Sequence, residues 1–275
     1  MKTLYVSDLD GTLLNSNTAL TDTTIETINA LVEEGMEFTF ATARSITSAS
    51  LVSRGLHLRT PLIVYNGVYL LDPDSHDILY SHSFTRQDAQ DILNYLLRHD
   101  MIPFVYSYID GRERVSYMEE GMHEGGKYYM ESRPYDKRFR KVDTTEQLLE
   151  GDVFYFTCIH DGSFLKPMYE YLEETTDYVI VFQQELYREE YWLEVMPRGV
   201  SKAQAILELK EKGGYDRVIS FGDAINDLPM FQISDECYAV GNAIEELKNT
   251  ATAVIGDHDA DAVAMWLKEN YQKKA

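Results

Sequence analysis

The sequence predicts an α/β fold in which a mostly parallel sheet is interrupted by an inserted α+β domain. Short apolar runs alternate with a helical pattern over residues 1–83, and the same alternation returns over residues 198–275. Between these segments, in residues 84–197, strand-like runs instead follow one another through short turns. We therefore expect a core built from residues 1–83 plus 198–275 and an inserted domain of residues 84–197.

The first segment contains three apolar runs of strand length. Residues 3–7, 38–41 and 62–65 are expected to be buried strands, of the kind found in a sheet that is covered on both faces. Residues 21–34 predict a helix, because their apolar side chains recur at helical spacing and Gly35 follows them. This alternation of strands and helix along the chain favours βαβ units and a parallel sheet.

The middle segment shows a different pattern of predicted strands and helices. Its two adjacent runs, 102–109 and 114–118, are separated by Asp110-Gly111, which is a hairpin signal. We expect helices at 86–99 and 164–174, and strands at 102–109, 114–118, 153–159, 178–183 and 191–196. Most of the 20 tyrosines fall in this segment, where packing between sheet and helices is the simplest explanation for each.

The last segment restores the α/β alternation. We expect helices at 202–212 and 261–270, and strands at 217–221, 238–240 and 253–255. The joins near Ser83 and Pro197 would then be the linkers between the two domains.

Charge and composition exclude several classes of partner. The 275 residues carry a formal net charge of −21, which repels nucleic acid and anionic membrane surfaces. No apolar run approaches the roughly 18 residues needed to span a bilayer. Only Cys158 and Cys237 are present, so there is no disulfide framework, and we expect a cytoplasmic protein. The charge does not argue against a small anionic substrate, because a local cation can reverse the field inside a pocket.

Two carboxylates follow the first expected strand, in Asp8-Leu9-Asp10-Gly11-Thr12. Residues i and i+2 of an extended chain point the same way, so Asp8 and Asp10 can face one pocket at the carboxyl edge of the sheet. Such a pair repels unless a cation lies between them, and hard oxygen ligands favour Mg²⁺. The alternative is a solvated turn with an incidental pair of acids.

A second acidic segment, Gly222 to Asp227, follows the expected strand 217–221. Asp223, Asn226 and Asp227 supply oxygen ligands, although alone this segment is typical of an ordinary turn. Together, two acidic strand ends can build a Mg²⁺ site. Thr42 and Arg44 after the second strand, and Lys202 at the start of a helix, could hold a phosphoryl group there.

The motifs together resemble the haloacid dehalogenase (HAD) superfamily, and the size and place of the insert resemble its Cof-type, type IIB phosphatases. The motifs that carry the resemblance are Asp8-x-Asp10-Gly-Thr, Thr42-Ala43-Arg44, Asn66-Gly67, Gly199-Val-Ser-Lys202 and Gly222-Asp223-x-x-Asn226-Asp227. The resemblance spans the whole chain. It implies a Rossmann-like core, an inserted α/β cap domain, and Mg²⁺-dependent hydrolysis of phosphate esters through an aspartyl-phosphate.

The resemblance also implies residue roles. Asp8 matches the nucleophile, Asp10 the general acid and base, and Lys202 the cation that holds Asp8 and the phosphate. The implied metal ligands are Asp8, Asp10 through its backbone carbonyl, Asp223 and Asp227, with Asn226 or Asp227 contacting phosphate or orienting metal and water. The implied substrate-binding residues are Thr42, Ala43, Arg44, Asn66, Gly67, Lys202 and Asn226.

The sequence departs from the family pattern at three places. Ala43 stands where the family usually has Gly, Ala203 follows the motif lysine where Gly is frequent, and Asp261-Ala262-Val263 lacks a Gly found near the end of relatives. No catalytic group is lost.

Two other functions stay open at this stage. One is a phosphosugar mutase or phosphotransferase on the same core, and the other is a non-enzymatic phospho-acceptor module, against which the large insert argues. The expected partner is a small-molecule phosphate ester, with sugar phosphates foremost. The charged runs 112–114 and 138–141 could bind sugar, nucleotide or cofactor phosphates, but solvated faces are the simpler expectation for each.

Overall fold

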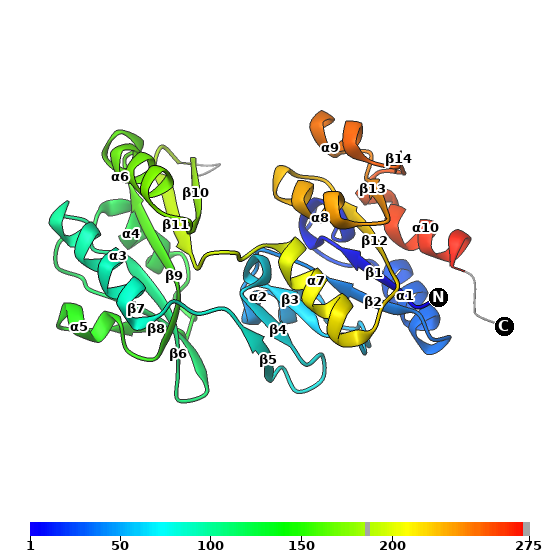
Figure 1. Cartoon of the computed structure of the whole chain (residues 1–275), viewed down its shortest axis with the longest axis horizontal. Coiled ribbons are helices and arrows are strands. Elements are labelled where there is room, and N and C mark those ends of the chain that lie inside the picture. Colours follow the sequence, from blue (N-terminus) through cyan, green and yellow to red (C-terminus); the bar gives the residue numbers. More distant parts are fainter. Residues whose placement is uncertain (185–187, 272–275) are drawn as a thin grey trace. The chain divides into compact units, whose positions relative to one another are not determined.

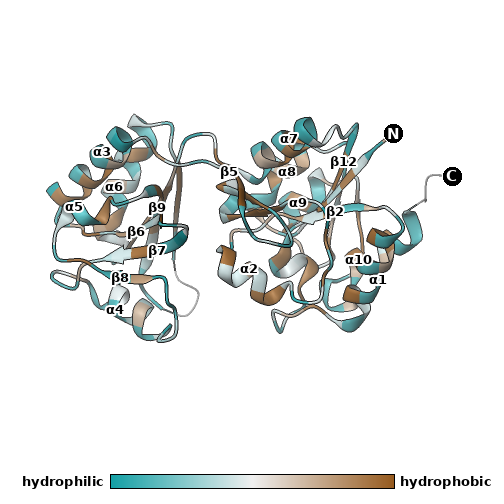
Figure 2. Cartoon of the chain, turned by 90° about the horizontal axis from the view of Figure 1, so that it is seen from below, coloured by the Kyte–Doolittle hydropathy of each residue, from teal (hydrophilic) through white to brown (hydrophobic). Residues whose placement is uncertain are grey.

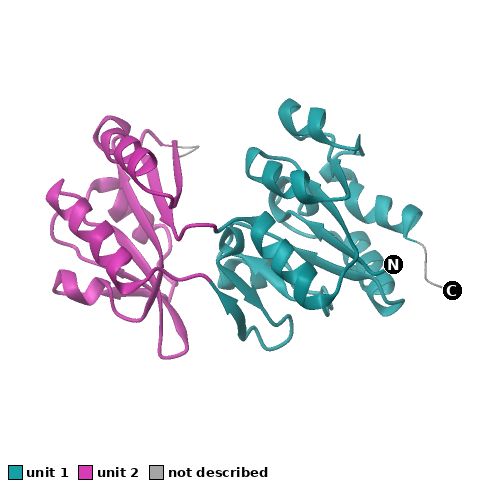
Figure 3. Ribbon diagram, viewed as in Figure 1, with its two compact units in different colours: residues 1–81, 200–275 teal, residues 82–199 magenta. Residues whose placement is uncertain are grey.

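The computed structural model describes residues 1–184 and 188–271, which form two compact units (Figure 3). The core unit comprises residues 1–81 and 200–275, and the inserted unit comprises residues 82–199. The predicted boundaries, 83/84 and 197/198, lie two residues from these joins. Residues 185–187 of the predicted insert and 272–275 of the predicted core lie outside the described residues.

The core unit is built on a parallel sheet with the strand order β14-β13-β12-β1-β2. Its strands are β1 (Thr3–Ser7), β2 (Glu37–Phe40), β12 (Arg217–Gly222), β13 (Glu236–Ala239) and β14 (Ala253–Val254). Figures 1 and 2 show helices on both faces of this sheet. One face carries α7 (Lys202–Gly213) and α8 (Leu228–Ile233), and the other carries α1 (Asp22–Glu33) and α10 (Ala262–Asn270).

The third predicted strand pairs differently from the other two. β3 (Leu62–Val64) forms an antiparallel sheet with β4 (Tyr69–Leu71) and β5 (Ile78–Ser81). One parallel bridge, between Ala41 and Ile63, joins it to the chain that continues from β2. The core unit is completed by α2 (Ile46–Val52), α9 (Glu245–Thr250) and the helical turns η1 (Leu9–Leu13), η2 (Tyr65–Gly67), η3 (Ile225–Asp227) and η4 (His258–Ala260).

The inserted unit contains a sheet with the order β10-β11-β9-β6-β7-β8, in which only β7 and β8 pair in parallel. Its strands are β6 (Phe104–Ile109), β7 (Arg112–Tyr117), β8 (Phe139–Lys141), β9 (Asp152–His160), β10 (Val179–Gln184) and β11 (Tyr191–Met196). Its helices are α3 (Arg86–Arg98), α4 (Glu124–Glu131), α5 (Thr145–Leu148) and α6 (Gly162–Thr175). The two units together confirm the predicted fold class.

The two faces of the inserted sheet differ in chemistry. Val105 and Leu193 belong to a buried apolar cluster shared with α3 and α6. Their neighbours Phe104 and Trp192 point the other way, because side chains alternate along a strand, and both contact Tyr129 of α4. None of the helices in the described ranges has the length and apolar character needed to cross a membrane.

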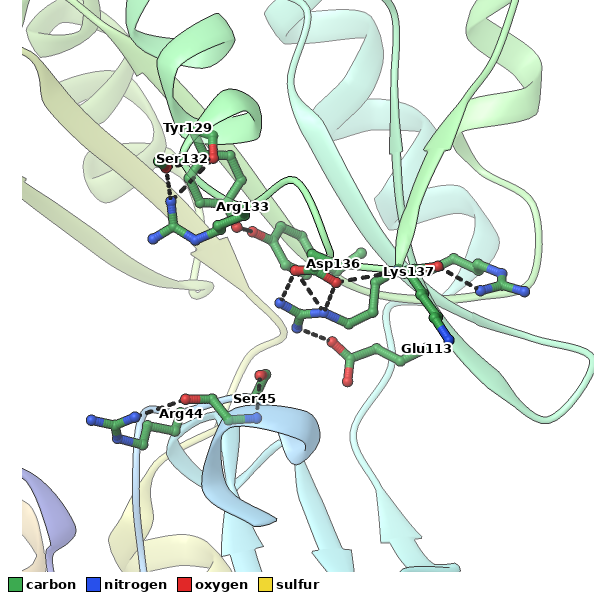
Figure 4. A network of polar contacts seen from close by, with 12 residues as sticks. Arg44, Ser45, Glu113, Tyr129, Ser132, Arg133, Asp136 and Lys137 are labelled. Carbon is green, nitrogen blue, oxygen red and sulfur yellow. Dashed lines mark hydrogen bonds and ion pairs between the residues drawn. The ribbon is translucent and has the colours of Figure 1, made fainter. Parts of the chain in front are cut away.

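The charged runs of the insert are not simply solvated, which corrects the sequence prediction. Arg138 donates to Glu113 at 2.5 Å and to Asp136 at 2.6 Å (Figure 4). The side chains of Glu113 and Arg138 are only 7% and 16% exposed. The two runs meet because β7 and β8 are neighbours, a pairing that the sequence alone did not predict.

Candidate active site

Neighbouring parallel strands bring the two acidic segments together. Ser7 of β1 pairs with Phe221 of β12, and the Asp8 amide donates to the Phe221 carbonyl at 2.9 Å. Asp8 and Asp223 therefore leave the same edge of the sheet side by side. This edge, at the carboxyl ends of the strands, is where open α/β sheets bind ligands.

Lys202 links two of the carboxylates inside this pocket. Its Nζ donates to Asp8 Oδ1 at 2.6 Å and to Asp227 Oδ1 at 2.7 Å. Lys202, Asp8 and Asp227 are 2%, 5% and 0% exposed, so the three charges are withdrawn from water. Asp227 Oδ2 accepts from the backbone amides of Asp223 and Ala224, so every oxygen of this side chain has a partner.

The position of Lys202 depends on a close approach between two loops. Ser201 caps α7 by accepting from the Gln204 amide, so Lys202 is the first residue of the helix. Gly67 lies against Ser201, and a Cβ at residue 67 would come within 2.4 Å of the Ser201 carbonyl oxygen. Only glycine fits there. Gly67 therefore acts through its lack of a side chain, which lets the loop lie against Ser201 and the start of the helix that carries Lys202.

Asp223 completes a group of three carboxylates. Oxygens of Asp8, Asp223 and Asp227 lie within 4.8 Å of one another. Asp223 Oδ1 accepts from the Thr12 hydroxyl at 2.7 Å. Gly11 has a φ of +72°, and a Cβ there would come within 2.5 Å of Asp223 Oδ2. The turn after Asp10 therefore has to contain glycine for Asp223 to occupy this place.

The electrostatics of the pocket follow from burial. Burial raises the pKa of Asp8 well above its ordinary value, and the nearby Asp227 carboxylate adds to the rise against the opposing effect of Lys202. Burial also opposes the charge on Lys202, but Asp8 and Asp227 outweigh it and raise the pKa of the ammonium. The pKa of Asp223 is raised too, chiefly by burial. Lys202 therefore stays protonated, and its single positive charge does not balance the three carboxylates.

Asp10 is placed differently from Asp8. Its side chain is half exposed and accepts two hydrogen bonds from Arg44, from Nε at 2.7 Å and from Nη2 at 2.5 Å. The guanidinium of Arg44 therefore holds Asp10 in this structure. The Arg44 amide in turn donates to Thr42 Oγ1, which is fully buried.

The remaining predicted residues divide into two groups. Asn66 lies close to the Thr42 loop, because its amide donates to the Thr42 carbonyl at 2.9 Å, and its Oδ1 is buried without a hydrogen bond from the described residues. Ala43 and Asn226 are exposed. Asn226 makes no side-chain hydrogen bond within the described part of the chain, so the structure does not bring it into the cluster.

Two residues near the site were not singled out from the sequence. Thr12 holds Asp223, and it lies within the Asp8–Thr12 motif itself. Asn242 donates from Nδ2 to the Gly11 carbonyl at 2.8 Å, which fastens the loop after Asp10. The sequence could have indicated Asn242, because this residue also follows a parallel strand, β13.

Comparison with known proteins places this geometry in context. A family model described as haloacid dehalogenase-like hydrolase matches residues 5–267. The pyridoxal phosphate phosphatase YbhA of Escherichia coli is 24% identical to this chain, covering 94% of the chain and 95% of the relative. The 5-amino-6-(5-phospho-D-ribitylamino)uracil phosphatase YitU of Bacillus subtilis is 23% identical, covering 98% and 97%.

Solved structures show the same fold over the whole chain. TM0651 from Thermotoga maritima superposes with a TM-score of 0.80 at 25% identity, covering 100% of this chain and 99% of that chain. The sugar phosphatase BT4131, described as a member of HAD subclass IIB, superposes with a TM-score of 0.71 at 20% identity, covering 98% of each chain. The similarity therefore includes both the core unit and the inserted unit.

Proposed function

Because this chain belongs to the haloacid dehalogenase-like hydrolases, we propose that it is a Mg²⁺-dependent phosphatase that acts through an aspartyl-phosphate intermediate. The membership confirms the resemblance found in the sequence and the prediction of a hydrolase, and the relatives named as phosphatases support that class of enzyme. We propose small phosphorylated metabolites as substrates, with sugar phosphates foremost, since the proteins compared above are named for small phosphorylated compounds or sugars.

The observation that carries this proposal is the charge of the pocket. When all three are ionised, the carboxylates of Asp8, Asp223 and Asp227 contribute −3 and Lys202 contributes +1, which leaves −2 in a largely buried site. Buried charge of this kind is costly unless a partner neutralises it. HAD hydrolases use a divalent metal, and the oxygen-only donor set fits Mg²⁺ in particular.

In this proposal Asp8 is the nucleophile. Lys202 fixes Asp8 Oδ1, whereas Asp8 Oδ2 has no hydrogen bond from the described residues. Asp8 and Asp223 would hold the metal together with the Asp10 carbonyl, while Asp227 keeps Lys202 and the Asp223 amide in place. When bound, the cation screens the phosphate from the carboxylates and stabilises charge in the transition state.

Proton transfer is assigned to Asp10. Asp8 attacks phosphorus in line, and neutral Asp10 gives its proton to the leaving alkoxide. Ionised Asp10 then takes a proton from the water that cleaves the acyl phosphate, which restores both groups. Because Arg44 holds Asp10 in the structure, Asp10 has to exchange that contact for the leaving oxygen in each cycle.

Phosphate positioning is assigned to Thr42, Lys202 and the loop beside Asn66. Thr42 Oγ1 accepts from the Arg44 amide, so its hydroxyl hydrogen is free to donate to a phosphate oxygen. The ammonium of Lys202 donates to Asp8 and Asp227, and its third N–H would bind the phosphate. Asn226, which is exposed, would act only at the edge of the site.

The test is a panel of phosphate esters assayed with Mg²⁺ and with chelator. Asp8→Asn should lower turnover by on the order of 10⁴-fold or more, because it removes the nucleophile. Asp74→Asn, an exposed aspartate of the core unit, is the matched control and should behave as wild type. Full Mg²⁺-dependent activity of Asp8→Asn on an aryl phosphate would overturn the nucleophile assignment.

A further inference from the structure

The inserted unit holds a cavity of about 290 Å³ with aromatic and cationic walls. Tyr128 and Tyr129 of α4 and Trp192 of β11 supply the rings, and Arg133 and Arg188 supply the cations. The residues assigned to phosphate hydrolysis above do not line it. Its size is near the lower end of small-molecule pockets, so a ligand of one or two rings would fit.

The two arginines lie against the aromatic rings. The guanidinium carbon of Arg133 lies 4.3 Å from the centre of the Tyr129 ring, and that of Arg188 lies 4.2 Å from the centre of Tyr128. Trp192 meets Tyr129 edge-on at 5.1 Å between ring centres. A planar guanidinium stacked on a ring keeps its N–H groups pointing outward at its edge, where they can bind an anion.

The hydrogen-bonding edges of the two arginines differ. Arg188 directs Nε and Nη2 to both oxygens of Glu190, at 2.9 and 2.5 Å. Arg133 uses only Nη1, which donates to the Ser132 hydroxyl and to the Tyr129 carbonyl (Figure 4). Its Nε and Nη2 have no acceptor among the described residues, and no carboxylate there forms an ion pair with it.

Two less exposed arginines of this chain show which partner such an edge can bind. Arg44 binds Asp10 through Nε and Nη2, and Arg138 binds Asp136 through the same two nitrogens. In each case the partner is a carboxylate, which matches the guanidinium fork in shape and charge. Arg133, which is exposed, presents the same fork at the rim of an aromatic cavity, and no carboxylate of residues 1–184 or 188–271 pairs with it.

We propose that this cavity is a binding site for a small aromatic acid, whose carboxylate pairs with the Nε–Nη2 edge of Arg133 and whose ring packs against Tyr128, Tyr129 and Trp192. Arg188 and Glu190 neutralise each other, so Arg133 provides the net positive charge of the cavity. In a chain of formal charge −21, an anion needs such a local cation in order to bind. The residues that line the cavity are not among those assigned to phosphate hydrolysis, and the inference does not rest on that function.

The test is calorimetric titration of benzoate into the full chain with chelator present. Wild type should bind benzoate saturably, and benzamide and cyclohexanecarboxylate should each bind more weakly, since one lacks the charge and the other the aromatic ring. Arg133→Gln should raise the Kd for benzoate about tenfold or more, because a charge-assisted pair is lost. Arg133→Lys, which keeps the charge but not the fork, should also weaken binding. Arg54→Gln, an exposed arginine of the core unit, is the control and should not.

Two results would overturn the site. One is no saturable benzoate binding to wild type, and the other is a benzoate Kd that is the same in Arg133→Gln, or in Arg133→Lys, as in wild type. Asp8→Asn should bind benzoate as wild type does, because it leaves the inserted unit intact. If Asp8→Asn, and not Arg133→Gln, weakens binding, benzoate occupies the hydrolytic site and the inference is wrong. The phosphatase proposal is tested separately by turnover.

Discussion

The core unit and the inserted unit bury polar groups in opposite ways. In the core unit, Asp8 and Asp227 share one lysine, and Asp223 adds a third carboxylate nearby. In the inserted unit, the buried hydroxyls of Tyr106 and Tyr129 bond to each other at 2.7 Å.

The charged groups of the inserted unit differ less sharply from those of the core unit. Arg138 is likewise shared by two carboxylates, but Glu113 and Asp136 keep 7% and 14% exposure, and Glu194 accepts a hydrogen bond from Tyr155. Polar groups that satisfy one another stabilise a fold without any ligand, whereas an excess of buried like charge costs stability until something binds. The comparison therefore distinguishes polar groups that stabilise the fold from polar groups that need a bound ligand to balance their charge. Four substitutions test this distinction.

Lys202→Met should have the largest effect, because it leaves two buried carboxylates without their cation. We expect the free energy of unfolding of the core unit to fall by about 3–5 kcal/mol in chelator. Turnover should fall roughly a thousandfold. Urea unfolding followed by Trp266 fluorescence in a Trp192→Phe background measures the first effect. Lys212→Met, at the exposed end of the same helix, is the control, and equal stability of both variants in chelator would contradict the argument.

Gly11→Ala tests whether the space beside Asp223 matters. The added Cβ would lie 2.5 Å from Asp223 Oδ2, so Asp223 has to move, and we expect Mg²⁺-dependent turnover to fall roughly 100-fold. Gly214→Ala is the matched control, because φ is +63° there but no atom lies within 4 Å of the new Cβ. It should cost about 1 kcal/mol of stability and leave turnover unchanged. Equal turnover in the two variants would show that the space beside Asp223 is not needed for activity.

Glu194→Gln tests the inserted unit. Burial raises the pKa of Glu194 from 4.5 to about 7, with Tyr155 opposing the shift. The folded state therefore binds this proton more tightly, so the contribution of Glu194 to stability is greatest below pH 4.5, falls as the pH rises towards 7, and is constant above. Partial exposure of the side chain limits the fall to roughly 2 kcal/mol.

The glutamine variant should not show this fall. Urea unfolding between pH 4.5 and 8, followed by Trp192 fluorescence in a Trp266→Phe background, compares the two proteins. Parallel pH profiles for wild type and Glu194→Gln would mean that Glu194 titrates normally in the folded protein.

Ala43→Gly should have the smallest effect. Ala43 is exposed and has no positive φ, so the backbone here does not need glycine. We expect less than a twofold change in kcat/KM and a loss of stability of up to about 1 kcal/mol from added chain entropy. A large gain in turnover would show that a flexible backbone at this position is part of the mechanism.

Much of the fold was predictable because its strands are short, apolar and bounded by polar turns. The strands 3–7 and 191–196 were predicted with the bounds that the structure has. The helix α4 was missed because Gly125 and Gly126 are weak helix formers, and it is held by packing that the sequence does not display. β4 and β5 were missed because they are short strands in a separate antiparallel sheet, in which β4 pairs with β3 and β5 pairs with β4.

The candidate site was predictable in composition but not in its contacts. Asp8, Asp223, Asp227 and Lys202 were named from strand and helix ends, and parallel pairing brings such ends together. The pairing of Arg44 with Asp10 was not predicted, because the direction of a long side chain depends on surroundings that are distant in sequence. The same holds for Asn242, whose partner Gly11 lies 231 residues away.

The structure also shows why Asp261-Ala262-Val263 does not need a glycine. Ala262 is buried and has no positive φ, so an alanine fits its backbone. Asp261, just before it, has a φ of +55° and accepts hydrogen bonds from Thr21 and Thr24. Nothing in the structure explains Ala203.

The inserted unit is one continuous stretch of chain, whereas the core unit is divided by it, and this sets an order of events during synthesis. Strand β1 emerges first, but its neighbour β12 and the helix that begins at Lys202 follow only after residue 199. The insert has every strand of its own sheet before then, and domains fold as units as they leave the ribosome. The nascent chain therefore carries Asp8 without its lysine until the insert has been made, and the acidic pocket can be assembled only after that point.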